Sequence, residues 1–205
     1  MKKTSSQPPV NNIELLIPSW EQIYGSILKL TEAVRHSGFD PDIIVGVSRG
    51  GWIPARIMSD LLGNAKLANI AAEFYVGVAE TKPKPTITQQ VSVSVESKKV
   101  LVVDDVADTG ESLKLVNEHL KMNDASNIKA ATIYYKPWSI TVPDYYQETT
   151  RSWIVFPWER KEATRKIVEK FRAEGRSVQE AKEKLISSGL DRELAERFIK
   201  EIFGE

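Results

Sequence analysis

Two adjacent carboxylates followed by a turn rich in hydroxyl groups are the residues of this chain best suited to chemistry. An apolar run ends in Asp104 and Asp105, and Thr109, Gly110 and Ser112 follow at the expected start of a helix. Free backbone N–H groups and the helix dipole favour a phosphate there. Paired carboxylates accept hydrogen bonds from two sugar hydroxyls. The pattern predicts a site for ribose 5-phosphate, and its alternative is an ordinary turn with an acidic cap.

A second candidate anion site is the run Ser48-Arg49-Gly50-Gly51, which directly follows a short apolar stretch. The guanidinium group offers several donors in a fork that suits a diphosphate. The two glycines expose backbone N–H groups as an anion-binding nest. Taken alone, this run is more typical of a plain turn between a strand and a helix than of an anion site.

The elements that must position these residues follow from apolar periodicity. A helix is expected from Ser19, with Gln22 completing a capping box, to a stop at Gly38. Further helices are expected at 52–62 and 111–122, and strands at 42–47, 65–76, 91–95, 99–104 and 128–135. This alternation predicts an α/β fold, a mostly parallel sheet flanked by helices. The glycine-bearing loops should then meet beyond the carboxyl ends of the strands.

The first run resembles the PRPP-binding signature of the type I phosphoribosyltransferases, in which apolar residues, two acids and Thr-Gly-x-Ser/Thr follow one another. The resemblance implies the fold of that family, and Mg²⁺ as the cofactor. Asp104 and Asp105 would hold the ribose hydroxyls and the water shell of the metal. The residues implied to hold the 5-phosphate are Ala107, Asp108, Thr109, Gly110, Glu111 and Ser112.

The second run resembles the pyrophosphate loop of the 6-oxopurine phosphoribosyltransferases, especially the xanthine–guanine type. This implies that Ser48, Arg49, Gly50 and Gly51 hold pyrophosphate. It also implies a cis peptide bond between Ser48 and Arg49. Asp108 falls where that branch keeps the acid that faces N7 of the base, which makes it the expected catalytic acid or base. Its alternative is a cap at the start of the helix.

Residues 134–159 resemble the base-binding hood of the same branch, through Tyr-Tyr-Lys-Pro and Trp-x-x-x-Pro-Trp-Glu. The resemblance implies that Trp153 stacks on the purine and that Lys136 reaches the atom at C6. The backbone of Trp153 and Ile154 would bond the base edge, and Glu159 would hold the metal through water. The alternatives are a core aromatic for Trp153 and a solvated surface side chain for Lys136.

Composition narrows the class of protein. The chain has 205 residues, no net charge and no cysteine, so no basic field indicates a nucleic-acid partner and no disulfide can form. No apolar run is long enough for a membrane span, and a cytoplasmic location is expected. The expected organisation is a loose arm at 1–12, a core at 13–159 and a three-helix bundle at 160–205, with helices at 160–173, 178–188 and 191–203.

The helical tail resembles that of an archaeal subgroup whose substrate is adenine. The expected reaction is therefore transfer of the phosphoribosyl group from PRPP to adenine, giving AMP and pyrophosphate in purine salvage by a homodimer. Hypoxanthine or guanine is the alternative, because Lys136 and Asp108 favour an oxo-purine. A more remote alternative is a regulator that senses PRPP without turnover. The loop 77–90, with its lysines and prolines, fits either a closing lid or an exposed hairpin.

Overall fold

The computed structural model describes residues 13–63, 66–75 and 84–204, which form two compact units. The first unit contains Tyr24–Thr150, and the second joins residues 13–23 to the stretch from Arg151 onward. The sequence predicted residues 151–159 and 13–23 with the core, whereas their contacts group them with the helical tail. The expected arm at 1–12 lies outside the described residues.

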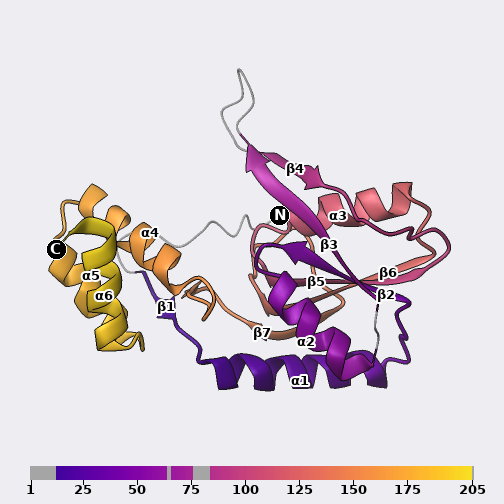
Figure 1. Ribbon diagram of the computed structural model, residues 1–205, viewed down its shortest axis with the longest axis horizontal. Coiled ribbons are helices and arrows are strands. Elements are labelled where there is room, and N and C mark those ends of the chain that lie inside the picture. The colour runs from indigo at the N-terminus through magenta and orange to yellow at the C-terminus, as the bar shows by residue number, and fades with distance from the viewer. Residues whose placement is uncertain (1–12, 64–65, 76–83, 205) are drawn as a thin grey trace, which may run out of the picture. The chain divides into compact units, whose positions relative to one another are not determined.

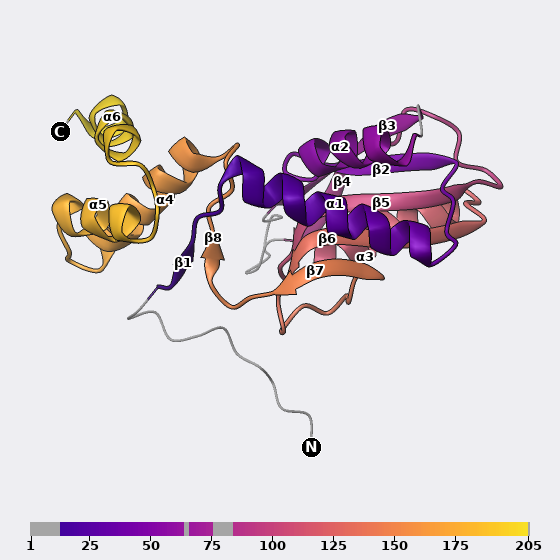
Figure 2. The same cartoon turned by 90° about the horizontal axis from the view of Figure 1, so that it is seen from below.

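The first unit is built on a six-stranded sheet of order β4-β3-β2-β5-β6-β7, in which all neighbours are parallel except β3 and β4 (Figure 1). Helices α1 and α2 cover one face and α3 the other (Figure 2). The elements are α1 (Trp20–His36), β2 (Ile43–Ser48), α2 (Trp52–Leu62), β3 (Leu67–Tyr75), β4 (Lys84–Gln89), β5 (Lys99–Ala107), α3 (Glu111–Met122), β6 (Asn127–Tyr135) and β7 (Tyr145–Thr149). The predicted α/β class with a mostly parallel sheet is confirmed.

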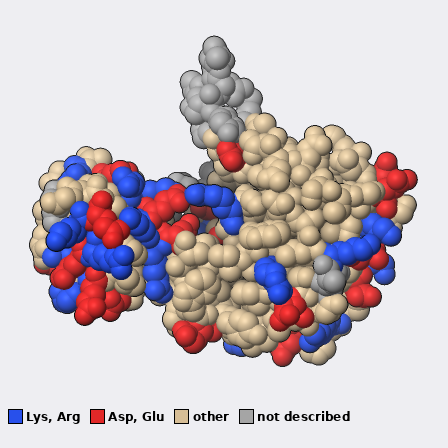
Figure 3. Space-filling view, in the orientation of Figure 1, with Lys and Arg blue, Asp and Glu red and all other residues tan. Residues whose placement is uncertain are grey.

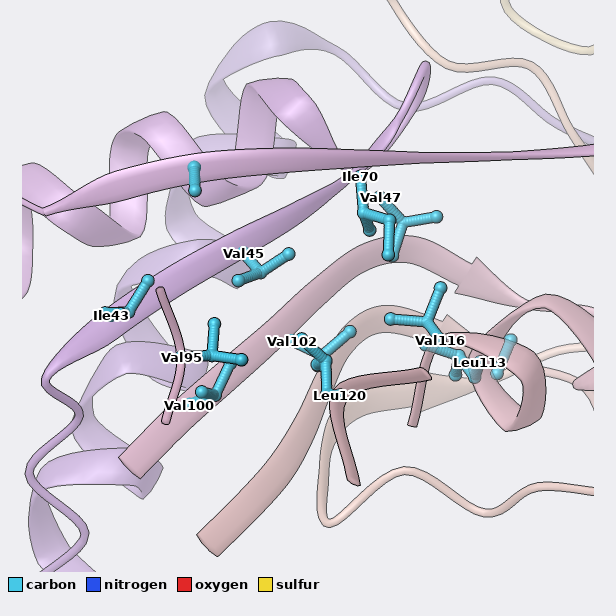
Figure 4. Packing of buried hydrophobic residues seen from close by; sticks show 12 residues of the cluster. Ile43, Val45, Val47, Ile70, Val95, Val100, Val102, Leu113, Val116 and Leu120 are labelled. Atoms are coloured by element: carbon cyan, nitrogen blue, oxygen red, sulfur yellow. The ribbon is translucent and has the colours of Figure 1, made fainter. Parts of the chain in front are cut away.

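The central strands are buried on both faces, as parallel strands between helix layers require. Val45 and Val102 point toward Leu113 and Val116 of α3 and form one apolar cluster (Figure 4). The intervening residues of β2 and β5 are also buried and face the opposite side. This packing fixes the two strands from which both predicted anion loops emerge.

One predicted strand is wrong. Residues 91–95 alternate apolar and polar, yet the strand that returns beside β3 is β4, from Lys84 to Gln89. Val95 is buried in the apolar cluster under α3, and Val91 packs against it. The apolar spacing of this irregular segment therefore arises from contacts with the core and not from strand pairing. The predicted loop 77–90 therefore ends in a strand, and its residues 77–83 lie outside the described part.

The second unit contains two short parallel strands, β1 (Leu15–Leu16) and β8 (Trp153–Ile154), and three helices. The helices are α4 (Arg160–Ala173), α5 (Val178–Ser187) and α6 (Arg192–Phe203), as the sequence predicted. Their core includes Ile167, Phe171 and Leu185, and Ile13, Leu15, Ile17 and Trp153 pack against it. Lysines, arginines and carboxylates alternate closely on the surface of this unit, at the left of Figure 3. None of the described helices is long and apolar enough to cross a membrane.

We expect removal of the chain after residue 160 to lower solubility. The truncation would expose the side chains of Ile13, Leu15, Ile17, Trp153 and Val155, which belong to one apolar cluster with the helices that it removes. The change is measured by gel filtration and by binding of a hydrophobic dye. A truncated protein with the full thermal midpoint and no dye binding would contradict this packing role.

Candidate functional site

The two predicted anion loops leave neighbouring strands at the same edge of the sheet. β2 and β5 pair in parallel, with Gly46 opposite Val103, and both loops follow the carboxyl ends of these strands. The chain order reverses between β2 and β5, and α2 and α3 lie on opposite faces. This is the switch point at which open α/β sheets bind their ligands.

Two glycines allow the loop 48–51 to pack directly against the paired carboxylates of Asp104 and Asp105. A Cβ atom on Gly50 would overlap the carboxylate of Asp105. A Cβ atom on Gly51 would overlap the carbonyl oxygen of Val103 and lie 2.7 Å from the Cα atom of Asp104. The peptide bond between Ser48 and Arg49 is cis, as the resemblance predicted. The structure thus brings the loop 48–51 and the two aspartates into direct contact.

The paired carboxylates carry an electrostatic conflict. The backbone N–H of Asp105 donates to Oδ1 of Asp104 at 2.9 Å. Burial, and then the neighbouring charge of Asp105, raise the pKa of Asp104 well above its ordinary value. Two like charges in a partly desolvated place are stabilised by donors or cations that arrive with a ligand.

Gly110 is the N-cap of α3, in the left-handed conformation with φ 80°. The side chain of Thr109 accepts a hydrogen bond from the backbone N–H of Glu111 at 3.3 Å. The alternative interpretation of Asp108 as the helix cap is therefore wrong, because the capping position lies two residues later. The turn 107–110 and the first turn of α3 form the N-terminus that the sequence predicted for the phosphate.

The segment 136–141 is bonded to this turn along its length. The N–H of Lys136 donates to the carbonyl oxygen of Ala107 at 3.0 Å, and that of Ile140 to Thr109 at 2.8 Å. The hydroxyl of Thr141 donates to the carbonyl oxygen of Gly110 at 2.9 Å. A Cβ atom on Gly110 would lie 2.6 Å from the backbone nitrogen of Thr141, so only glycine allows this approach.

Lys136 is buried, with 4% of its surface exposed, so the solvated alternative is wrong. Burial lowers the pKa of its ammonium group, and the nearby charge of Asp108 opposes that shift. The indole N–H of Trp138 donates to Oδ1 of Asp108 at 2.9 Å, and Nζ of Lys136 lies 5.5 Å from the centre of the Trp138 ring. Sequence reasoning missed Trp138, although its place two residues after Lys136 is a usable signal.

The other predicted base contacts lie in the second unit. Trp153 and Ile154 form β8, and Glu159 precedes α4 at its capping position. Trp153 is half-buried and packs against the helical core. Its backbone N–H donates to the carbonyl oxygen of Glu14 at 2.8 Å. Within the described residues, no group of three or more His, Cys, Asp or Glu side chains could hold a metal by itself.

Comparison with known proteins agrees with this geometry. Residues 19–164 match the phosphoribosyl transferase domain. A xanthine-guanine phosphoribosyltransferase of Cereibacter sphaeroides is 30% identical over 69% of this chain and 84% of its own length. A crystal structure of a purine phosphoribosyltransferase from Pyrococcus horikoshii is 41% identical, has a TM-score of 0.65, and covers 71% of this chain and 94% of its own.

The match shows an enzyme of the glycosyltransferase class with an α/β core. The chain belongs to the phosphoribosyltransferase family, and it is a type I purine phosphoribosyltransferase that resembles the 6-oxopurine branch. More than a quarter of the chain has no counterpart in the Pyrococcus structure, although that structure is almost wholly matched.

Proposed function

We propose that this enzyme transfers the phosphoribosyl group of PRPP to a 6-oxopurine, releasing pyrophosphate and a nucleoside monophosphate. The burial of Lys136 beside Asp108 is the observation that carries the proposal. An ammonium group only donates hydrogen bonds, and the oxygen at C6 of guanine, xanthine or hypoxanthine is a matching acceptor. The xanthine-guanine enzymes among the relatives support the same choice. This replaces the expectation of adenine, whose amino group at C6 is a donor.

The contact between the two loops supports the proposed roles of the PRPP-binding residues. Asp104 and Asp105 accept hydrogen bonds from the ribose hydroxyls, and the turn 107–112 holds the 5-phosphate at the N-terminus of α3. The residues 48–51 hold the pyrophosphate, with the Arg49 guanidinium as a charged donor. Both ends of the substrate are then fixed around C1 while positive charge develops on the sugar ring.

Mg²⁺ fits the donors at this place. Two adjacent carboxylates supply the hard oxygen atoms that it prefers. Burial, and then the neighbouring charge of Asp105, raise the pKa of Asp104, and a bound cation would favour the charged form of both side chains. Asp104 and Asp105 would hold it through its water molecules, and when bound it would neutralise the departing pyrophosphate. A contribution of Glu159, which belongs to the second unit, stays a prediction from the family resemblance. Removal of the proton from the base falls to Asp108, which is exposed at the turn.

The base hood is proposed from Trp153 and Ile154. An aromatic face suits stacking on a purine. The backbone N–H of Trp153 is already bonded to the carbonyl oxygen of Glu14. Alternate residues of a strand direct their backbone groups to opposite edges, so the base edge would meet the backbone of Ile154.

A cytoplasmic location and a homodimer stay predictions, as do the functional boundaries of the core at 13–159 and the bundle at 160–205.

Adenine is the second candidate, favoured by the folded helical tail that resembles an adenine-specific subgroup. An assay of the wild-type enzyme with PRPP, Mg²⁺ and each purine in turn tests both candidates, with pyrophosphate release as the readout. Turnover with guanine, xanthine or hypoxanthine supports the proposal, and turnover with adenine alone overturns it. Binding of PRPP without turnover of any purine would indicate a PRPP-sensing regulator instead.

Replacement of Lys136 by Ala should lower kcat/KM for an oxo-purine by more than about tenfold, because a hydrogen bond to a charged group contributes roughly 1.5–3 kcal/mol. The KM for PRPP should stay nearly constant. Lys114→Ala is the matched control, since Lys114 lies on α3 in an exposed pair with Glu118. A Lys136→Ala enzyme with wild-type kcat/KM would show that Lys136 does not contribute to recognition of the base.

A further inference from the structure

Trp138 joins the two polar side chains proposed to read the base. Its indole N–H donates to Oδ1 of Asp108 at 2.9 Å, and Nζ of Lys136 lies 5.5 Å from its ring centre. All three residues belong to the first unit, on the turn 107–110 and the segment 136–141, which are bonded to each other at three further places. The arrangement therefore lies within one compact unit and is tied together by backbone hydrogen bonds.

The edge of a 6-oxopurine presents N7 and the C6 oxygen side by side. The carboxylate and the ammonium group that contact these atoms must therefore keep a fixed spacing. Lys136 is held by burial, whereas Asp108 is exposed and, without an anchor, would sample several rotamers. A hydrogen bond to one carboxylate oxygen restricts that motion and leaves the second oxygen for the substrate.

We propose that Trp138 is a positioning residue, whose indole N–H holds the Asp108 carboxylate at the spacing from Lys136 that the base edge requires. This rests on the proposed 6-oxopurine activity and extends it to a residue that does not touch the reacting atoms. The aromatic ring also covers the buried ammonium group, which is the usual geometry of a cation–π contact.

The variant Trp138→Phe tests the indole N–H, because the ring against Lys136 is kept. We expect kcat/KM for the oxo-purine to fall about tenfold or more, the effect typical of a lost hydrogen bond to a charged group, while the KM for PRPP changes less than about twofold. Tyr145→Phe is the control. It removes a hydroxyl that is hydrogen-bonded to Ser37 at 2.7 Å, away from the site, and should leave both constants unchanged.

A double-mutant cycle separates positioning from general stability. In an Asp108→Ala enzyme the further change Trp138→Phe should cost less than about twofold, because the indole has lost its target. The NMR signal of the Trp138 indole N–H should also shift in Asp108→Ala, a reading that needs no turnover. An equal loss in both backgrounds, or an unmoved indole signal, overturns the proposal.

The failure of the proposed function gives a different pattern. A wild-type enzyme that turns over no oxo-purine overturns that function and the positioning role with it. An active wild type whose Trp138→Phe variant keeps its kcat/KM overturns the positioning role alone. A Trp138→Phe protein that fails to fold is recognised by a lowered thermal midpoint. In that case the indole N–H signal in Asp108→Ala decides whether Trp138 positions Asp108.

Discussion

The double variant Asp104→Asn, Asp105→Asn is expected to lose at least about a hundredfold in kcat/KM for PRPP, since both proposed acceptors of the ribose hydroxyls lose their charge. The fold should survive, because Asn keeps the shape of Asp. The pKa of Asp104 is raised, so the folded protein holds that proton more tightly than the unfolded chain does. The aspartate therefore costs stability increasingly as the pH rises from its ordinary range toward the raised value.

The same variant should consequently be as stable as the wild type at neutral pH, or more stable. Thermal unfolding and calorimetric titration with PRPP measure the two effects separately. Asp124→Asn is a control for loss of a carboxylate elsewhere, since Asp124 lies in the exposed turn after α3. Wild-type PRPP affinity in the double variant would show that the paired aspartates do not hold the ribose.

The variant Gly51→Ala is expected to lower the free energy of unfolding by at least about 2 kcal/mol and to weaken PRPP binding. The backbone of Gly51 has φ −69°, which alanine adopts freely, so the cost is purely steric. The new methyl group would overlap the carbonyl oxygen of Val103 and lie 2.7 Å from that of Val47. Both are backbone atoms of the buried strands β5 and β2, which cannot withdraw without disturbing the sheet.

Gly25→Ala is the matched control, because nothing lies within 4 Å of a Cβ atom at that position in α1. It should raise stability by roughly 0.5–1 kcal/mol, as expected for alanine in a helix interior. Chemical unfolding compares the two variants directly. A Gly51→Ala protein as stable as the wild type would mean that the loop 48–51 can move away from Asp104 and Asp105 without loss of stability.

The sequence predicted the two candidate anion loops because their pattern is local. The order of a strand, two acids and a glycine turn is contiguous, so the strand end at Asp104 and the helix start at Gly110 could be predicted from a few neighbours. The cis bond at Ser48–Arg49 was predicted from the family resemblance of its loop. The capping box of Ser19 and Gln22 is equally local, and both hydrogen bonds form, at 2.7 and 3.2 Å.

What escaped prediction depends on partners far apart in the chain. β8 exists because Trp153 pairs with Leu15, a contact that no local pattern signals. Trp138 was overlooked because its target, Asp108, lies on another strand–helix connection. The strand predicted at 91–95 was wrong because Val95 is buried in the cluster under α3. Burial of an irregular segment can produce the same apolar spacing as a strand.

The pairing of β1 with β8 makes the helical unit discontinuous in the chain. Its core needs Ile13, Leu15 and Ile17 from before the sheet unit and α4 to α6 from after it. The first unit is thus inserted in the chain between the two parts of the second unit. During synthesis, residues 13–17 emerge before the first unit and lack their partners in the second unit's core until α4 to α6 have been made. Completion of that core brings together two segments that the whole of Tyr24–Thr150 separates in the chain.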